Sequence, residues 1–334
     1  MACNARTGMA TLTAMRAAVV TAFTGPDGVA VQDIPEPEPR PGEVLIDVHA
    51  AGVIFPDVLQ TRGQYQLRPE LPFVLGWEVA GVVRHAAGGH PVGDRVAAMP
   101  VIGGFAQTVA VRPDWVFPLP DAVSFEAGAA LPVNYLSMHF AYRLRAHLQA
   151  GETVLVHGAA GGLGSAACQL AAAYGARVLA VVSSPAKADL ARACGAHDVV
   201  PADGFLDQVR SLTDGRGVDV VVDPVGGDRF TDSLRALATH GRLVVLGFTG
   251  REIPTVAVNR LLLRNIAVLG AGSREYYQDH PGAAARAWAE LTPLMNSGAI
   301  APPVTATYPL AQTAAALRAI DERRALGRLV IRLR

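Results

Sequence analysis

A run of small residues at 154–164 has the composition of a phosphate-binding turn. The stretch VLVHGAAGGLG places Ala159, Gly161, Gly162 and Gly164 between a β-branched strand pattern and an Ala-rich helix pattern. Without bulky side chains the backbone can approach a diphosphate, and the start of the helix offers unpaired N–H groups. We therefore predict a dinucleotide-binding loop. Ala159 stands at the first glycine of the usual G-x-G-x-x-G pattern, so an ordinary tight turn stays the alternative.

The residues after the next strand bear on which dinucleotide is bound. A second apolar run at 176–182 precedes Ser183, Ser184 and Lys187. NAD sites usually place Asp or Glu here to bind the ribose hydroxyls, whereas two hydroxyls and a lysine can bind a 2′-phosphate. This pattern favours NADPH over NADH. The alternative is that the serines cap the next helix and Lys187 is a solvated surface charge.

Composition limits the classes of protein to consider. The chain has 334 residues, 51% of them hydrophobic, and a formal net charge of zero. This length predicts about two domains, and the lack of a basic run argues against a nucleic-acid partner. No apolar run reaches membrane-spanning length, no signal peptide is apparent, and Cys3, Cys168 and Cys194 form no C-x-x-C pair. We expect a cytoplasmic protein with no membrane partner. Residues 1–14 are expected to form a disordered leader.

Two kinds of strand pattern divide the chain. Up to about Pro120, short alternating segments such as 43–50 are separated by Pro and Gly and predict a compact, largely β domain. After the phosphate loop, continuous apolar runs that end in small residues predict buried parallel strands. These runs lie at 218–227, 241–248 and 264–270.

Five separated motifs in this order resemble the medium-chain dehydrogenase/reductase superfamily, and more narrowly its zinc-independent quinone oxidoreductase branch. They are PGEVLI at 41–46, AGVIFPD at 51–57, GWEVAG at 76–81, VGDRV at 92–96 and the loop at 158–164.

The resemblance implies an α/β fold with a GroES-like, largely β catalytic domain and a Rossmann domain with a doubly wound parallel sheet. The catalytic domain is expected at 15–134 and 274–334, and the NADPH-binding domain at 135–273. A helix near 129–137 would join them, with a cleft between the domains. The strand at 265–270 would pair with its two-fold mate in a homodimer.

The positions that hold zinc in the alcohol dehydrogenases of the superfamily match Ile54, Trp77 and Val133. None of these side chains can ligate zinc, so we expect no metal. Without a Lewis acid, acceptors that spread the incoming negative charge are favoured. The resemblance therefore implies an NADPH-dependent reductase of quinones or α,β-unsaturated carbonyl compounds (enones).

Four residues are candidates for the acceptor side of the site. Tyr65 aligns with the proton donor of related enoyl-thioester reductases, and the alternative is a tyrosine packed at a loop edge. Many relatives have Asn where Ile54 stands, and some have Tyr where Leu59 stands. With the large Trp77 nearby, these residues predict a smaller, more apolar pocket. The alternative is that Ile54 and Trp77 only fill the space left by the missing zinc.

The resemblance also assigns cofactor contacts. Ala202 stands where relatives use a tyrosine near the adenosine phosphate. Asn134 would reach the nicotinamide region or cap the joining helix. The remaining residues are grouped by the part of the cofactor that they would face: Ala160, Gly161, Gly162 and Leu163 the diphosphate; Ser183, Ser184 and Lys187 the 2′-phosphate; and Ser137, Val225 and Phe248 the nicotinamide or its ribose.

Two other functions remain open: an enoyl-thioester reductase, and a non-catalytic NADPH-binding protein of the crystallin kind. Asp57 and Glu78 are interpreted as charges tied to backbone or arginine rather than as an acid–base pair. The histidines, among them His139 and His157, lack ligand spacing or a nucleophile partner and are interpreted as structural.

Overall fold

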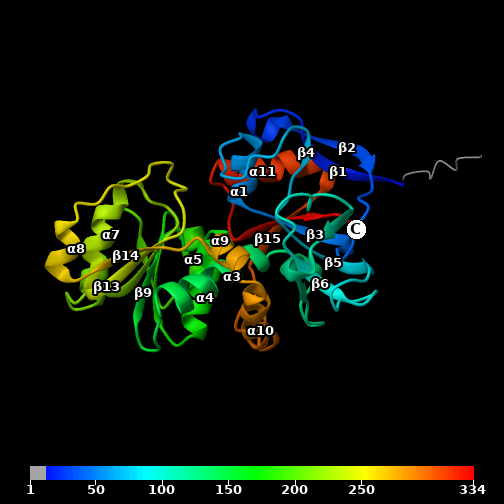
Figure 1. Cartoon of the computed structure of the whole chain (residues 1–334). Helices are drawn as coiled ribbons and strands as arrows, with labels where there is room; N and C mark the ends of the chain where they lie inside the picture. Colours follow the sequence, from blue (N-terminus) through cyan, green and yellow to red (C-terminus); the bar gives the residue numbers. More distant parts are fainter. Residues whose placement is uncertain (1–12) are drawn as a thin grey trace, which may run out of the picture.

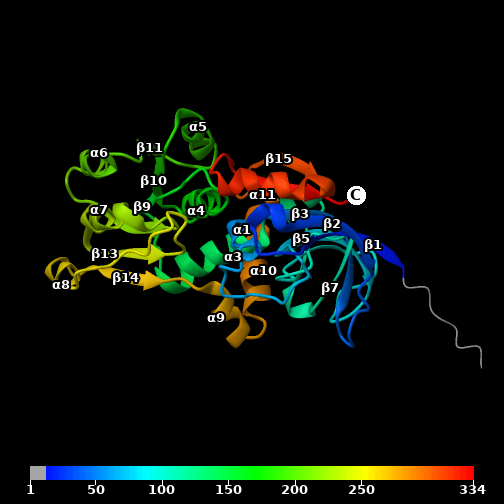
Figure 2. The same cartoon turned by 90° about the horizontal axis from the view of Figure 1, so that it is seen from above.

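Two large β-sheets form the frame of the molecule (Figures 1 and 2). The computed structural model describes residues 13–334. The first sheet has seven strands in the order β15-β16-β3-β5-β6-β8, with β7 paired to β3. Its strands are β3 (Val44–Val53), β5 (Glu78–His85), β6 (Arg95–Ala98), β7 (Thr108–Val111), β8 (Val116–Pro118), β15 (Val304–Pro309) and β16 (Arg328–Arg332).

The last two strands come from the far end of the chain. β16 runs antiparallel to β3, with Leu329 opposite Val53 and Arg332 opposite Ala50. The end of the chain therefore supplies two strands of the first sheet. A smaller sheet and three helices cover it: β1 (Ala14–Val20), β2 (Val29–Pro35), β4 (Phe73–Val74), α1 (Phe55–Thr61), α2 (Phe125–Gly128) and α11 (Thr313–Asp321).

The second sheet is parallel throughout, in the order β11-β10-β9-β12-β13-β14. The strand order reverses at β9, because β10 and β12 lie on its two sides, and ligands of such sheets bind at this switch point. Its central Val-rich strands are buried on both faces. The elements are β9 (Thr153–Val156), β10 (Arg177–Val182), β11 (Asp198–Pro201), β12 (Val218–Asp223), β13 (Leu237–Val245), β14 (Ala267–Gly270), α4 (Gly162–Ala173), α5 (Pro185–Ala193), α6 (Phe205–Leu212), α7 (Phe230–Ala236) and α8 (Asn259–Arg264).

Three helices lie between the two sheets (Figure 1): α3 (Pro132–His139), which continues as a π-helical segment to Arg145, α9 (Ser273–Asp279) and α10 (Ala283–Asn296). Trp288 of α10 stacks on Phe117 of β8 with ring centroids 4.9 Å apart. One buried apolar cluster contains both rings and Val156 of the parallel sheet. The two sheets therefore share packed side chains through these helices.

The predicted fold class is confirmed. The run predicted at 218–227 begins with β12, which ends at Asp223, before the small residues. The last strand predicted at 264–270 is present as β14, but its predicted start was wrong. α8 extends to Arg264, and Asn265 takes a left-handed backbone (φ 51°) before β14 begins at Ala267. Asparagine tolerates this conformation well. The expected leader lies mostly outside the described residues, and β1 begins at Ala14. The division into 15–134, 135–273 and 274–334 stays a prediction.

Between residues 13 and 334, no helix combines the length and apolar character that crossing a membrane requires.

Candidate functional site

The turn between β9 and α4 has the geometry of a phosphate loop. Gly158 takes the left-handed conformation (φ 60°), whereas Ala159 does not, so alanine is tolerated at 159. A Cβ on Gly164 would lie 2.1 Å from the Gly158 carbonyl oxygen, so the helix packs on the turn only with glycine there. Gly161 is the N-cap of the 12-residue helix α4. The first N–H groups of α4 therefore point out of the helix toward the switch point.

The predicted 2′-phosphate residues lie at the carboxyl end of β10. Lys187 Nζ donates a hydrogen bond to Ser183 Oγ at 3.0 Å. Ser184 is the N-cap of α5, but its hydroxyl makes no capping hydrogen bond. Capping therefore does not occupy either serine hydroxyl.

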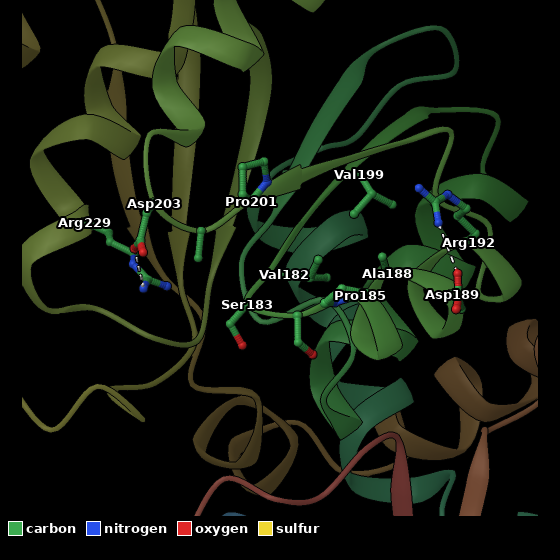
Figure 3. Close-up of a pocket in the computed structure, with 12 residues that line it drawn as sticks. Val182, Ser183, Pro185, Ala188, Asp189, Arg192, Val199, Pro201, Asp203 and Arg229 are labelled. Carbon is green, nitrogen blue, oxygen red and sulfur yellow. Dashed lines mark hydrogen bonds and ion pairs between the residues drawn. The ribbon is translucent and has the colours of Figure 1, made fainter.

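A pocket of about 540 Å³ opens beside these serines (Figure 3). It is lined on one side by Ser183, Ser184 and α5, and on the other by Ala202 and Arg229. Arg229 forms a 3.7 Å ion pair with the exposed Asp203. No sequence pattern singled out Arg229, which follows a different strand, β12. The pocket is large enough for part of a nucleotide, and the small Ala202 side chain leaves it open.

The loops after β12 and β13 meet at the phosphate turn. Asp223 Oδ1 accepts hydrogen bonds from the backbone N–H groups of Val225 and Gly226, both at 2.8 Å. A Cβ on Gly158 would lie 3.5 Å from Val225 Cγ2, so Val225 borders the turn. Phe248 is 38% exposed and packs over Gly226. The structure thus brings these two predicted residues to the same edge of the sheet.

The joining helix α3 brings Asn134 and Ser137 to this region. The N-cap of α3 is Leu131, so the alternative role of Asn134 as the helix cap was wrong. Asn134 Nδ2 is buried without a hydrogen-bond partner among the described residues. It lies 2.8 Å from where a Cβ on Gly162 would be. An unpaired amide donor therefore adjoins the start of α4.

A buried ion pair lies next to Asn134. Arg328, the first residue of β16, donates a hydrogen bond to Glu78 Oε1, and Glu78 Oε2 accepts from Val133 N at 2.8 Å. Burial raises the pKa of Glu78, while Arg328 and the Val133 amide oppose that shift. Arg328 Nη1 would lie 2.9 Å from a Cβ on Gly162. The guanidinium therefore faces the carboxylate on one side and the phosphate loop on the other.

The interpretation of the two buried acids is confirmed. Glu78 is held by an arginine and a backbone amide, and Asp57 Oδ2 accepts from Ile54 N at 2.9 Å at the start of α1. Burial raises the pKa of Asp57 well above its ordinary value. Sequence reasoning missed Arg328 as the partner of Glu78, since 250 residues separate them.

Tyr65 and Trp77 form an aromatic pair. Their rings meet edge to face, with centroids 5.2 Å apart. Trp77 is 3% exposed, and its Nε1 donates to Gln60 Oε1 at 2.8 Å. Burial raises the pKa of Tyr65, so the hydroxyl keeps its proton at neutral pH and can act as a donor. Arg274 of α9 lies over the Trp77 ring, 5.9 Å from its centroid.

Ile54 is buried at the N-cap of α1, and Leu59 is half-buried near the end of that helix. Ile54 and Trp77 both lie in well-packed surroundings. Their role as walls of a substrate pocket stays a prediction.

The two most buried histidines have structural partners. The His157 residue is 1% exposed, and its Nε2 is 2.8 Å from Ser233 Oγ. Burial lowers the pKa of His157 to about 4. His139 Nδ1 is 3.0 Å from the Tyr174 hydroxyl. Both imidazoles are therefore fixed within the core.

A catalytic zinc ion does not fit the residues of this site. Within the part of the chain that the structure describes, no three His, Cys, Asp or Glu residues are grouped as metal ligands. Trp77 has its one polar atom engaged by Gln60, and Val133 offers only a backbone amide that Glu78 already binds.

Comparisons with known proteins match both halves of the chain. Two family models match, the alcohol dehydrogenase GroES-like domain at residues 40–121 and the zinc-binding dehydrogenase family at 162–290. The rat quinone oxidoreductase-like protein 2 is 36% identical over 325 residues, which cover 96% of this chain and 92% of that protein.

Two solved structures are also similar over nearly the whole chain. A probable oxidoreductase from Mycobacterium abscessus superposes with a TM-score of 0.89 at 42% identity, covering 96% of this chain and 99% of that one. The quinone oxidoreductase from Thermus thermophilus, solved also in complex with NADPH, has a TM-score of 0.84 at 38% identity, covering 95% and 100%.

Proposed function

Because the chain belongs to the quinone oxidoreductase branch of the medium-chain dehydrogenase/reductase superfamily, we propose that it is an NADPH-dependent, zinc-independent reductase of quinones or enones. The observation that carries the proposal is the contact between Lys187 Nζ and Ser183 Oγ at the carboxyl end of β10. It puts a cation and a hydroxyl where an NAD site has a carboxylate. The adjoining pocket has room for the adenosine end of the cofactor.

The residues that would hold the cofactor carry complementary groups along its length. The N–H groups of Gly162 and Leu163 at the start of α4 would bind the diphosphate, where Arg328 Nη1 and Asn134 Nδ2 add donors. Ser183, Ser184 and Lys187 would bind the 2′-phosphate. Ala160 would face the diphosphate through its backbone, while Ser137, Val225 and Phe248 would border the nicotinamide ribose. When bound, NADPH supplies a hydride.

The side chains of the protein would orient the acceptor and donate one proton to it. The half-buried Tyr65, packed against the buried Trp77, offers an apolar edge against which a flat conjugated acceptor can pack. Tyr65 is protonated because burial raises its pKa, so its hydroxyl can donate a hydrogen bond, and then a proton, to the acceptor oxygen that becomes negative. Acceptors that delocalise this charge depend least on a metal.

The test is the loss of NADPH absorbance with a panel of acceptors: a naphthoquinone, an aryl enone, a 2-alkenal and crotonyl-CoA. Turnover of the quinone or the aryl enone that prefers NADPH to NADH and is unaffected by a chelator supports the proposal. Preference for crotonyl-CoA would indicate an enoyl-thioester reductase instead. Tight NADPH binding without turnover of any acceptor would indicate a non-catalytic cofactor-binding protein.

We further propose that the protein is a homodimer that pairs through β14. In the sheet formed by the described residues, β14 is an edge strand. The adjacent α8 exposes Val258, Leu262 and Leu263, which are 72%, 75% and 77% accessible. Pairing with a second copy would cover both an open strand edge and this apolar face. Light scattering tests this: the wild type is expected to be dimeric and the L262K/L263K variant monomeric, whereas a monomeric wild type contradicts the proposal.

A further inference from the structure

Arg274 is held beside the predicted acceptor site by the packing of α9 on α3 (Figure 1). Its neighbour Ser273 places its hydroxyl 2.9 Å from that of Ser137, and Tyr277 donates a hydrogen bond to the Leu136 carbonyl at 3.1 Å. These two contacts anchor the helix on both sides of Arg274. The start of α9 is therefore fixed relative to the residues expected to border the nicotinamide ribose.

The guanidinium of Arg274 has no counter-ion. It lies 5.9 Å from the centroid of the Trp77 ring, and its Nε is buried without a hydrogen-bond partner. Among residues 13–334, no carboxylate lies within ion-pair distance of Arg274, in contrast to the buried Arg328. A partly desolvated cation that lacks a partner is costly, and an anion that binds there recovers that free energy.

The charges that face this position do not neutralise Arg274. Arg274 lowers the pKa of Tyr65, whereas Glu275 and Asp57 raise it. Asp57 is fully buried in the first turn of α1, where burial raises its pKa and one oxygen accepts from the Ile54 amide. Glu275 is exposed and turns back toward Gly272. Neither carboxyl group contacts the guanidinium.

The negative groups of the cofactor have donors elsewhere. The start of α4 with Arg328, and the Ser183–Lys187 contact, lie at the diphosphate and 2′-phosphate positions. Arg274 instead adjoins the aromatic pair formed by Tyr65 and Trp77. A ligand that satisfies all three side chains has a flat aromatic body and an anionic group.

We propose that Arg274 binds a carboxylate on the acceptor, so that the substrates are aromatic conjugated carbonyl compounds that carry an acid group. This inference rests on the proposed function, whose reductase site it specifies. The planar guanidinium can bind a carboxylate through two parallel hydrogen bonds, which fixes the orientation of the acceptor as well as its affinity. Arg274 is in this account a specificity-determining residue.

The first test compares para-carboxybenzylideneacetone with its methyl ester, each with NADPH. R274M is expected to lower kcat/KM for the carboxylate about 10- to 100-fold through KM, and to leave the ester within about threefold. R274K should recover part of the loss, because it keeps the charge. R286M, which removes an exposed arginine from the next helix, should behave as the wild type. An equal loss for acid and ester, or no loss for the acid, overturns the proposal.

The second test does not depend on turnover. Calorimetry measures binding of the saturated ketone formed by reducing the carboxylate-bearing enone to the NADP⁺-loaded protein. Binding by the wild type that R274M weakens about 10-fold or more, with the melting temperature unchanged, supports the role of Arg274 even if neither acceptor is reduced. Failure of reduction then contradicts the proposed function alone, whereas equal binding by wild type and R274M contradicts the role of Arg274 alone.

Discussion

The guanidinium of Arg328 and the carboxylate of Glu78 form an ion pair whose side chains are only 3% and 0% exposed. The pair joins the first residue of β16 to the first residue of β5 and, through Val133 N, to α3. Gly327, the residue before Arg328, donates its backbone N–H to the Ala160 carbonyl in the phosphate loop at 2.8 Å. The end of the chain thus contacts both the first sheet and the phosphate loop.

Replacing Arg328 by Met is expected to lower the free energy of unfolding by about 3–5 kcal/mol, because Glu78 is left buried without its partner. Urea denaturation measures the change. The matched control is R332M on the same strand, whose pair with Glu126 is exposed and should contribute less than about 1 kcal/mol. The double variant E78L/R328M should regain part of the loss. Equal losses in R328M and R332M would contradict this assignment.

Replacing Lys187 by Ala is expected to raise KM for NADPH about 10- to 100-fold and to leave KM for NADH nearly unchanged, because a charge-assisted hydrogen bond to the 2′-phosphate is lost. Steady-state kinetics with both cofactors measure the effect. R192A is the control, since this arginine lies on the same helix, α5, but is paired with Asp189 at 3.2 Å. A parallel rise for NADH would show that Lys187 does not read the 2′-phosphate.

Replacing Tyr65 by Phe is expected to lower kcat for an aryl enone about 100-fold, because the proton donor is removed. The Kd for NADPH should not change. Burial raises the pKa of Tyr65 above 10.0, so the wild-type kcat should stay level as the pH rises to that value. Y308F, in β15 of the first sheet, is the control. An unchanged kcat in Y65F would leave Tyr65 with a packing role only.

Acid is expected to destabilise the protein through His157. Burial lowers the pKa of His157 from 6.5 to about 4, so the folded protein keeps this imidazole neutral while the unfolded chain binds a proton. The stability that it contributes is complete above pH 6.5 and is lost as the pH falls toward 4.

Denaturation of H157Q should therefore show a slope of unfolding free energy against pH that is smaller by up to about 1.4 kcal/mol per unit in this range. H85Q, which changes an exposed histidine, is the control and should keep the wild-type slope. A wild-type slope in H157Q would assign the acid sensitivity to other groups.

Features encoded by neighbouring residues were predictable from sequence. The apolar, β-branched residues at 218–223 favour a strand buried on both faces. The small residues at 158–164 allow a tight turn between a strand and a helix. Even so, the sequence placed the departure from the glycine pattern at Ala159, whereas the structure shows that Gly158 makes the left-handed turn. The start of the last strand was predicted three residues too early, because the sequence does not show that α8 extends to Arg264 and ends at Asn265.

Features that depend on distant contacts were not predictable. Arg274 has no pattern in its own segment, and its position becomes informative only when α9 packs on α3 and brings it to Trp77. Gln60 likewise looks like an ordinary helix residue until Trp77 Nε1 meets its side chain. Ion pairs and hydrogen bonds between residues far apart in sequence can be identified only once the fold is known.

The contact between Gly327 and Ala160 limits how this protein can be rebuilt from parts of its relatives. A chimera that exchanged only residues 135–273 would set a foreign phosphate loop against this chain's own Gly327 and Arg328. Recombination that preserves cofactor binding has to carry the final strand along with the parallel sheet, although it belongs to the other sheet. The phosphate loop and the final strand are therefore best exchanged together.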